Sequence, residues 1–214
     1  MKDWIGWHEG YNDPQSSLST RLARVQAHLA HALAFVPPGP IQLLSLCAGQ
    51  GHDVLGVLPD HPRRGDVRAL LVELDPVNAA LARDRAKVAG LTRIEVREAD
   101  AALTANYADA VPADVLLLCG IFGNVSSDDI RATATAAAVM CRPGGTVLWT
   151  RHRRPPDLTP RLRSWFGEAG FDEVAFESAP TATMTGVGVF RRRTSDLPTE
   201  SLLPTGPLFT FRAE

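Results

Sequence analysis

The sequence predicts an α/β fold in which helices cover both faces of a mostly parallel sheet. Short apolar runs alternate along the chain with longer segments of helical periodicity, as successive β-α-β units do. One of these runs, Ala69-Leu70-Leu71-Val72, is apolar on both faces, which is typical of a central parallel strand. Turn signals rich in glycine and proline separate the runs, and no internal repeat or long low-complexity tract interrupts them.

The first elements are a helix, a strand and a second, short helix. Residues 19–35 place Leu22, Val25, Leu29 and Leu33 at helical spacing, which predicts an amphipathic helix beside the sheet. An apolar strand begins at Ile41 and runs into small residues, and a short helix follows from about residue 53. The proline-rich stretches at 37–40 and 154–156 are interpreted as connectors within a domain.

Strand and helix signals then alternate to the end of the core. We expect strands at 68–74, 93–98, 114–119, 145–150, 171–177 and 186–192, and helices at 76–89, 127–140 and 160–169. The tail from Thr194 ends in Leu208-Phe209-Thr210-Phe211, whose alternation predicts a docked edge strand. The expected organisation is one domain over 1–214, with an N-terminal arm and helix at 1–36, a core at 41–193 and a docked tail at 194–214.

Composition excludes several classes of protein. The 214 residues are 45% hydrophobic and carry a formal net charge of −2, which gives no broad basic field for capturing nucleic acid. The three cysteines lie in or beside apolar runs without the spacing of metal ligands, so we expect buried thiols, no metal and no disulfide. No secretory signal and no membrane-spanning run is present, which favours a cytoplasmic protein without a membrane partner.

A loop of small residues follows the first strand and predicts a nucleotide site. Gly49 and Gly51 let the backbone turn sharply and approach a ligand closely. Glu73 ends the next strand, where a carboxylate can accept hydrogen bonds from a ribose diol. A dinucleotide site would have a third glycine where Val54 stands, which weakens a nicotinamide-dependent oxidoreductase as the interpretation. A nucleoside ligand without phosphates, such as S-adenosylmethionine (SAM), fits this loop.

The ends of the later strands carry further motifs that fit such a nucleoside site. Asp100 closes the strand at 93–98, the strand at 114–119 ends at Cys119 and runs into Gly120-Ile121-Phe122-Gly123-Asn124, and Arg142-Pro143-Gly144-Gly145 precedes another strand. With these motifs in order, residues 41–193 resemble the class I SAM-dependent methyltransferases. The resemblance implies a Rossmann-like class I methyltransferase fold, with a mostly parallel seven-stranded sheet, helices on both faces and an antiparallel last strand.

The resemblance also implies SAM as the cofactor and a set of cofactor-binding residues. That set is Ser45, Cys47, Ala48, Gly49, Gly51, Glu73 for the ribose, Leu74, Asp100 for the adenine amino group, Ala101, Cys119 and Gly120. Two positions depart from the family pattern. Ser45 stands where the family has an acidic residue for the methionine end, and Cys47 replaces the first glycine of the loop. Asp53 either supplies the missing carboxylate or is a favourable charge in the first turn of a helix.

Three residues are candidates for catalysis. His8 lies in an aromatic-rich opening segment that either folds over the cofactor as a lid or anchors an arm on the surface. His152 follows the strand at 145–150, and the neighbouring arginines Arg151, Arg153 and Arg154 would lower its pKa and keep it neutral as a general base. The same arginines could bind an acidic group of a substrate, or form a solvated loop. Asn124 lies where the family meets the acceptor, or caps the helix that begins near Ser126.

The sequence therefore predicts a SAM-dependent methyltransferase that acts on a small-molecule acceptor. An RNA or protein methyltransferase and a non-catalytic SAM-binding protein remain as alternatives, and a homodimer is a possible assembly. The motif after the fourth strand lacks the prolines of enzymes that methylate nucleobase amines, which disfavours DNA as the acceptor.

Overall fold

A computed structural model describes residues 9–13, 15–178, 185–194 and 203–212. Within them lies a seven-stranded sheet with the order β3-β2-β1-β4-β5-β7-β6. The strands are β1 (Ile41–Leu46), β2 (Val67–Glu73), β3 (Ile94–Glu98), β4 (Ala113–Leu118), β5 (Cys141–His152), β6 (Phe171–Glu177) and β7 (Thr185–Arg192). Strands β1 to β5 pair in parallel, and β7 is antiparallel to both of its neighbours. The predicted mostly parallel sheet with antiparallel pairing at its end is confirmed.

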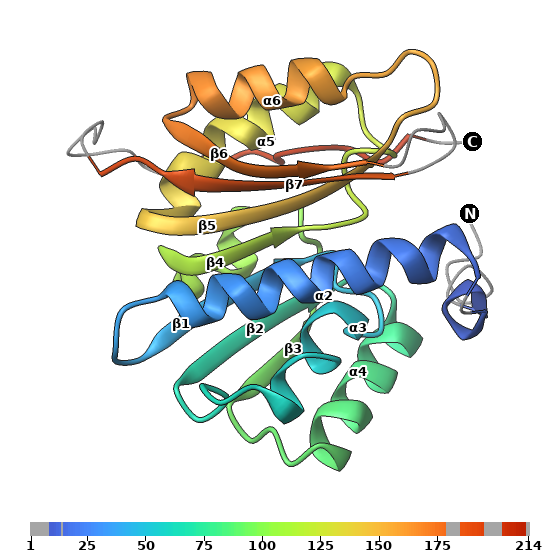
Figure 1. Cartoon of the computed structure of the whole chain (residues 1–214), viewed down its shortest axis with the longest axis vertical. Coiled ribbons are helices and arrows are strands. Elements are labelled where there is room, and N and C mark those ends of the chain that lie inside the picture. Colours follow the sequence, from blue (N-terminus) through green and yellow to red (C-terminus); the bar gives the residue numbers. More distant parts are fainter. Residues whose placement is uncertain (1–8, 14, 179–184, 195–202, 213–214) are drawn as a thin grey trace.

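Helices cover both faces of this sheet (Figure 1). One face packs against α2 (Ser17–Phe35), α3 (His52–Leu55) and α4 (Pro76–Val88), and the other against α5 (Ser127–Met140) and α6 (Thr159–Glu168). Each face has its own cluster of buried apolar side chains. Short 3-10 turns lie at η1 (Glu9–Asn12), η2 (Leu58–Asp60), η3 (Thr104–Asn106) and η4 (Ala108–Ala110).

Local sequence signals account for where the main helices begin. Ser16 caps α2, because its Oγ accepts a hydrogen bond from the backbone N–H of Ser19 at 3.0 Å. Asp75 caps α4 in the same way, and Pro76 follows at the first helical position. Ser126 and Asp129 form a reciprocal capping box at the start of α5. The caps of α4 and α5 lie in the loops that follow β2 and β4.

The register of the parallel strands brings their carboxyl ends to one edge of the sheet. Ser45 in β1 lies opposite Leu71 in β2 and Leu117 in β4. The loops that follow β1, β2 and β4 therefore meet at this edge. The strand order reverses at β1. The chain continues from β1 to β2 and β3 on one side of it, and then crosses to β4 on its other side. In open α/β sheets ligands bind at such a switch point.

The C-terminal segment differs from its prediction. No strand forms at residues 208–211, so the predicted edge strand is wrong. Leu208 and Phe209 are both buried, at 4% and 2% exposure, and join the cluster on the α5 face. A half-buried edge strand points successive side chains to opposite faces, so two consecutive buried residues indicate an irregular docked segment instead. Its backbone is held by Leu208 N–H, which donates to the carbonyl of Ala102 at 2.9 Å.

In the described part of the chain, none of the helices has the length and apolarity required to cross a bilayer.

Candidate functional site

The loop after β1 makes a tight left-handed turn. Cys47, Gly49 and Gly51 have φ angles of 54°, 56° and 72°. A Cβ at Gly51 would lie 2.7 Å from Cδ1 of Leu55, so this position needs glycine for both space and backbone conformation. The N–H of Ala48 donates to the carbonyl of Val72 in β2 at 3.0 Å, which ties the loop to the neighbouring strand. The backbone thus turns sharply at Gly49 and Gly51 as the sequence predicts, and Cys47, which replaces the first glycine of the family pattern, takes a third left-handed position.

Glu73 reaches from the end of β2 to this loop. Its Oε2 accepts a hydrogen bond from the N–H of Gly49 at 2.7 Å, and its Oε1 accepts one from the N–H of Asp75 at 2.9 Å. Burial raises the pKa of Glu73 above its ordinary value, although these N–H groups oppose the shift. An ionised carboxylate has about four acceptor sites, so Glu73 can still accept a further hydrogen bond after these are made. Glu73 is therefore fixed in place with acceptor capacity to spare.

Exposed apolar side chains occur in the segments that follow β2 and β3. Leu74 is 63% exposed and Leu103, on the loop after β3, is 40% exposed. Asp100 is also exposed, and its Oδ1 accepts a hydrogen bond from the N–H of Ala102 at 2.8 Å, while Ala101 is buried. Leu103 was not predicted as a site residue, and only its exposed apolar side chain distinguishes it.

Asp53, which follows the glycine loop, lies near Arg21 of α2. Ser45 is buried in β1 and carries no charge. Asp53 is in the first turn of α3, and its Oδ1 is buried without a hydrogen-bond partner. Burial raises the pKa of Asp53, and the positive charge of Arg21 opposes that shift. Arg21 is 8% exposed, and its Nη2 donates to Oη of Tyr11.

Sequence reasoning missed Arg21 as a site residue, although the sequence carries a signal for it. Arg21 precedes Val25 and Leu29 at intervals of four residues, so it occupies the apolar stripe of α2. A charged side chain on such a stripe is buried only where it has partners. Tyr11 is one such partner of Arg21. The centroid of the Tyr11 ring also lies 4.4 Å from that of His52, the residue before Asp53.

The loop after β4 is ordered by hydrogen bonds. The N–H of Gly120, which has a φ of 82°, donates to Oγ1 of Thr150 in β5 at 3.0 Å. Asn124 Nδ2 donates to the carbonyl of Gly120 at 2.8 Å, so this side chain holds the loop and does not cap α5. Cys119 is buried, and burial raises the pKa of its thiol well above the ordinary range, as expected for a structural cysteine.

His152 lies at the end of β5, against the loop after β4. A Cβ on Gly123 would lie 3.1 Å from Cδ2 of His152, so the ring packs directly on that glycine. Burial lowers the pKa of His152, and the charges of Arg151 and Arg154 lower it further. Arg153 is paired with Asp157 at 2.9 Å, and Arg151 donates to the carbonyl of Phe122. The environment of His152 therefore lowers its pKa in the predicted direction, with burial as the main cause.

His8 and the tryptophans at 4 and 7 lie outside the described residues. Within the described ranges, no group of three or more His, Cys, Asp or Glu side chains is placed to hold a metal ion. Cys47, Cys119 and Cys141 are free thiols.

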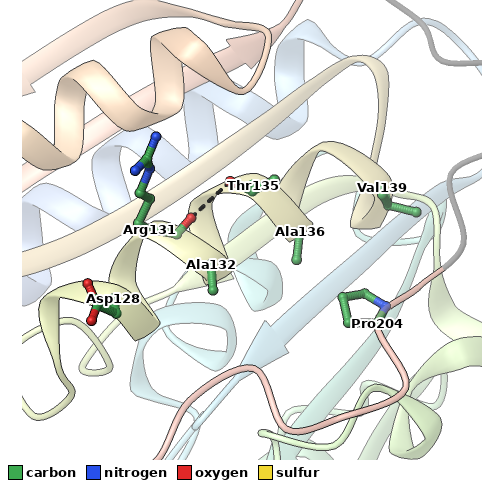
Figure 2. Close-up of a pocket in the computed structure, with 7 residues that line it drawn as sticks. All are labelled: Asp128, Arg131, Ala132, Thr135, Ala136, Val139 and Pro204. Atoms are coloured by element: carbon green, nitrogen blue, oxygen red, sulfur yellow. Dashed lines mark hydrogen bonds between the residues drawn. The ribbon is translucent and has the colours of Figure 1, made fainter.

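An open groove of about 620 Å³ lies away from the predicted cofactor residues (Figure 2). One side of α5, from Asp128 to Val139, lines it together with Pro204 of the C-terminal segment. None of these lining residues belongs to the glycine loop or to the strand ends. The groove is therefore separate from the candidate site described above.

No protein-family model matches the sequence, and no curated protein does. Solved structures match it in fold. Magnesium protoporphyrin IX methyltransferase from Synechocystis PCC 6803, with bound SAM, aligns with a TM-score of 0.64 and 10% identity over 87% of this chain and 89% of its own. An O-methyltransferase family protein from Burkholderia thailandensis aligns with a TM-score of 0.59 and 18% identity over 81% of this chain.

The chain spans 57% of that second protein and 54% of the CurJ carbon methyltransferase, which aligns with a TM-score of 0.60 and 15% identity over 80% of this chain. These likenesses, together with the strand order, show that the chain has the Rossmann-like fold of SAM-dependent methyltransferases, as predicted.

Proposed function

We propose that this chain binds SAM at the carboxyl edge of the sheet and transfers its methyl group to a small-molecule acceptor. The observation that carries the proposal is the clamp between Glu73 and Gly49. It holds a carboxylate at the end of β2 that can still accept a hydrogen bond from a ribose hydroxyl. The glycine loop beside it lets the backbone approach the nucleoside closely.

The neighbouring residues fit the rest of an adenosine. The exposed side chains of Leu74 and Leu103 offer apolar surface for the two faces of a purine ring. Asp100 follows β3 with an exposed carboxylate, which is suited to accept from the adenine amino group. The absence of a third glycine at Val54 removes the close helix approach that a pyrophosphate needs, so SAM fits this loop better than a dinucleotide.

When bound, SAM would supply a methyl group on a sulfonium, which is a good leaving group. The protein then has to orient the acceptor in line with the methyl and exclude water. We propose that Gly120 and Asn124 hold the wall of the acceptor site, because the Asn124 side chain fixes the Gly120 carbonyl. His152, kept neutral by burial and by neighbouring arginines, would take the acceptor's proton at an imidazole nitrogen.

A small-molecule acceptor is the best supported class. The net charge of −2 provides no general field for nucleic acid. The structural neighbours include proteins named for methylation of magnesium protoporphyrin IX, of oxygen and of carbon, so the fold by itself selects no acceptor atom. An RNA or protein substrate would need a basic or extended surface contributed by a partner.

Calorimetric titration tests the proposal. The intact chain should bind S-adenosylhomocysteine, the demethylated product of SAM, and should show no comparable binding of NAD. Glu73→Ala should weaken adenosylhomocysteine binding at least about tenfold, because a hydrogen bond to a charged group contributes roughly 1.5–3 kcal/mol. Glu168→Ala, at an exposed carboxylate on α6, is the matched control and should leave the affinity unchanged.

Preferential binding of NAD would remove the proposed cofactor. Full affinity in Glu73→Ala would show that this carboxylate does not hold the ribose.

A further inference from the structure

The amino-acid end of SAM presents a recognition problem that this chain does not solve in the way the family pattern suggests. That end carries an ammonium and a carboxylate. A site for it therefore needs a negatively charged hydrogen-bond acceptor and a positively charged hydrogen-bond donor side by side. With the ribose at Glu73, the opposite end of the ligand must extend past β1 toward β4, because the site lies at the switch point between these strands. Ser45, the β1 residue at this point, is a buried neutral hydroxyl.

Asp53 provides negative charge on the β4 side of the loop. It lies two residues after Gly51, in the first turn of α3. Its Oδ1 is buried and has no hydrogen-bond partner, a costly state for a carboxylate oxygen unless a ligand completes it. The side chain of Asp53 interacts with the thiol of Cys119, which directly follows β4. Asp53 therefore lies beside the loop after β4, which would face the sulfonium.

Arg21 of α2 provides the positive charge, and it lies near Asp53. The middle of α2 is held to the start of α3 by Gln26, whose Nε2 donates to the carbonyl of His52 at 2.9 Å. Tyr11 bridges the same two elements, because its hydroxyl accepts from Arg21 and its ring lies against that of His52. In Figure 1 the beginning of α2 lies at the right of the view, and α3 lies below α2.

We infer that Asp53 and Arg21 together hold the zwitterionic amino-acid end of SAM, with Asp53 accepting from its ammonium and Arg21, supported by Tyr11, donating to its carboxylate. This inference rests on the proposed function. It assigns the role that the family gives to an acidic residue of β1 to an aspartate on the following helix and an arginine on the preceding one.

The experiment compares three ligands that share an adenosine and a thioether. Adenosylhomocysteine carries both charges, its decarboxylated analogue keeps only the amine, and methylthioadenosine lacks the amino-acid end. Asp53→Asn should weaken binding of the first two at least about tenfold and leave methylthioadenosine within about twofold of the unmodified protein. Arg21→Gln should weaken adenosylhomocysteine only, and leave the amine analogue as tightly bound as before or more tightly. Asp60→Asn, at an exposed aspartate on η2, is the matched control and should change none of the three.

Each other outcome has a definite meaning. Equal losses for all three ligands in Asp53→Asn would show that Asp53 only supports the loop, and unchanged adenosylhomocysteine binding would show that it does not touch the ligand; both overturn the inference. If Asp53→Asn does not fold, the double variant Ser45→Asp/Asp53→Asn returns a carboxylate to β1 and should bind adenosylhomocysteine more tightly than methylthioadenosine; failure to do so overturns the inference. An unmodified protein that binds none of the three ligands refutes the proposed function itself, whereas binding without discrimination refutes only the role of Asp53 and Arg21.

Discussion

At the scale of single residues, Cys47 has the most unusual backbone of the site. Among the described residues it is the one non-glycine with a positive φ, at 54°. A side chain in this region costs roughly 1–2 kcal/mol, because Cβ crowds the following carbonyl. The loop keeps this conformation because Ala48 and Gly49, which follow directly, are bonded to Val72 and Glu73. Strain at this position is therefore maintained by the contacts that shape the candidate site.

Substitutions at Cys47 should separate backbone strain from side-chain packing. Cys47→Gly relieves the strain but adds about 0.5–1 kcal/mol of unfolded-state entropy and removes a thiol that packs on the core, so the free energy of unfolding should change by less than about 1 kcal/mol. Cys47→Val places a β-branched residue at positive φ and should lower it by more than about 2 kcal/mol. Urea unfolding measures both. Equal stability of the glycine and valine variants would contradict a strained loop.

His152 should make stability depend on pH in a predictable direction. Its pKa in the folded protein is below the ordinary value of 6.5. As the pH falls below that value the unfolded chain takes up a proton that the folded chain does not, so stability present above it is lost. His152→Gln should therefore reduce the loss of unfolding free energy between about pH 7 and pH 5. His31→Gln, at an exposed position on α2, is the control. A steeper loss in His152→Gln would reverse the assigned sign.

At the scale of elements, the sequence predicted most of what depends on local signals. The strands and the starts of α4 and α5 follow from apolar runs, from Asp75-Pro76 and from the Ser126 box, all of which act within a few residues. The position of Glu73 at a strand end was predicted for the same reason. Its clamp on Gly49 was not, because a contact across 24 positions depends on how β1 and β2 align.

The C-terminal segment and α2 show which features cannot be predicted from local sequence patterns. The alternation at the C-terminus reads as a strand, yet Phe209 and Leu208 pack into the cluster on the α5 face, where hydrophobic contact outweighs strand propensity. The apolar periodicity of α2 does not identify Arg21, because periodicity counts apolar residues alone. A charged member of the buried stripe is an exception to the pattern, and such exceptions are expected at functional sites.

At the scale of the whole molecule, the C-terminal segment connects two walls of the candidate site. Leu208 N–H donates to the carbonyl of Ala102 after β3, and Arg212 N–H donates to the carbonyl of Asn124 after β4 at 2.8 Å. Thr104 Oγ1 also donates to the carbonyl of Pro204 at 2.6 Å. The segment therefore fastens the proposed adenine loop and the proposed acceptor loop to the same stretch of chain. Its burial should influence both stability and ligand binding.

Phe209→Ala tests this coupling. The Phe209 side chain is 2% exposed, so its removal leaves a cavity in the cluster on the α5 face and should lower the free energy of unfolding by about 3–5 kcal/mol. Phe211 is 38% exposed and contacts Phe209 edge to face with 5.5 Å between ring centroids, so Phe211→Ala should cost less than about 1.5 kcal/mol. If the segment braces both loops, Phe209→Ala should also weaken adenosylhomocysteine binding under conditions where the variant stays folded, while Phe211→Ala should not. Comparable destabilisation by the two substitutions in urea would mean that the segment is not anchored at Phe209, and an unchanged affinity would mean that the loops hold their shape without it.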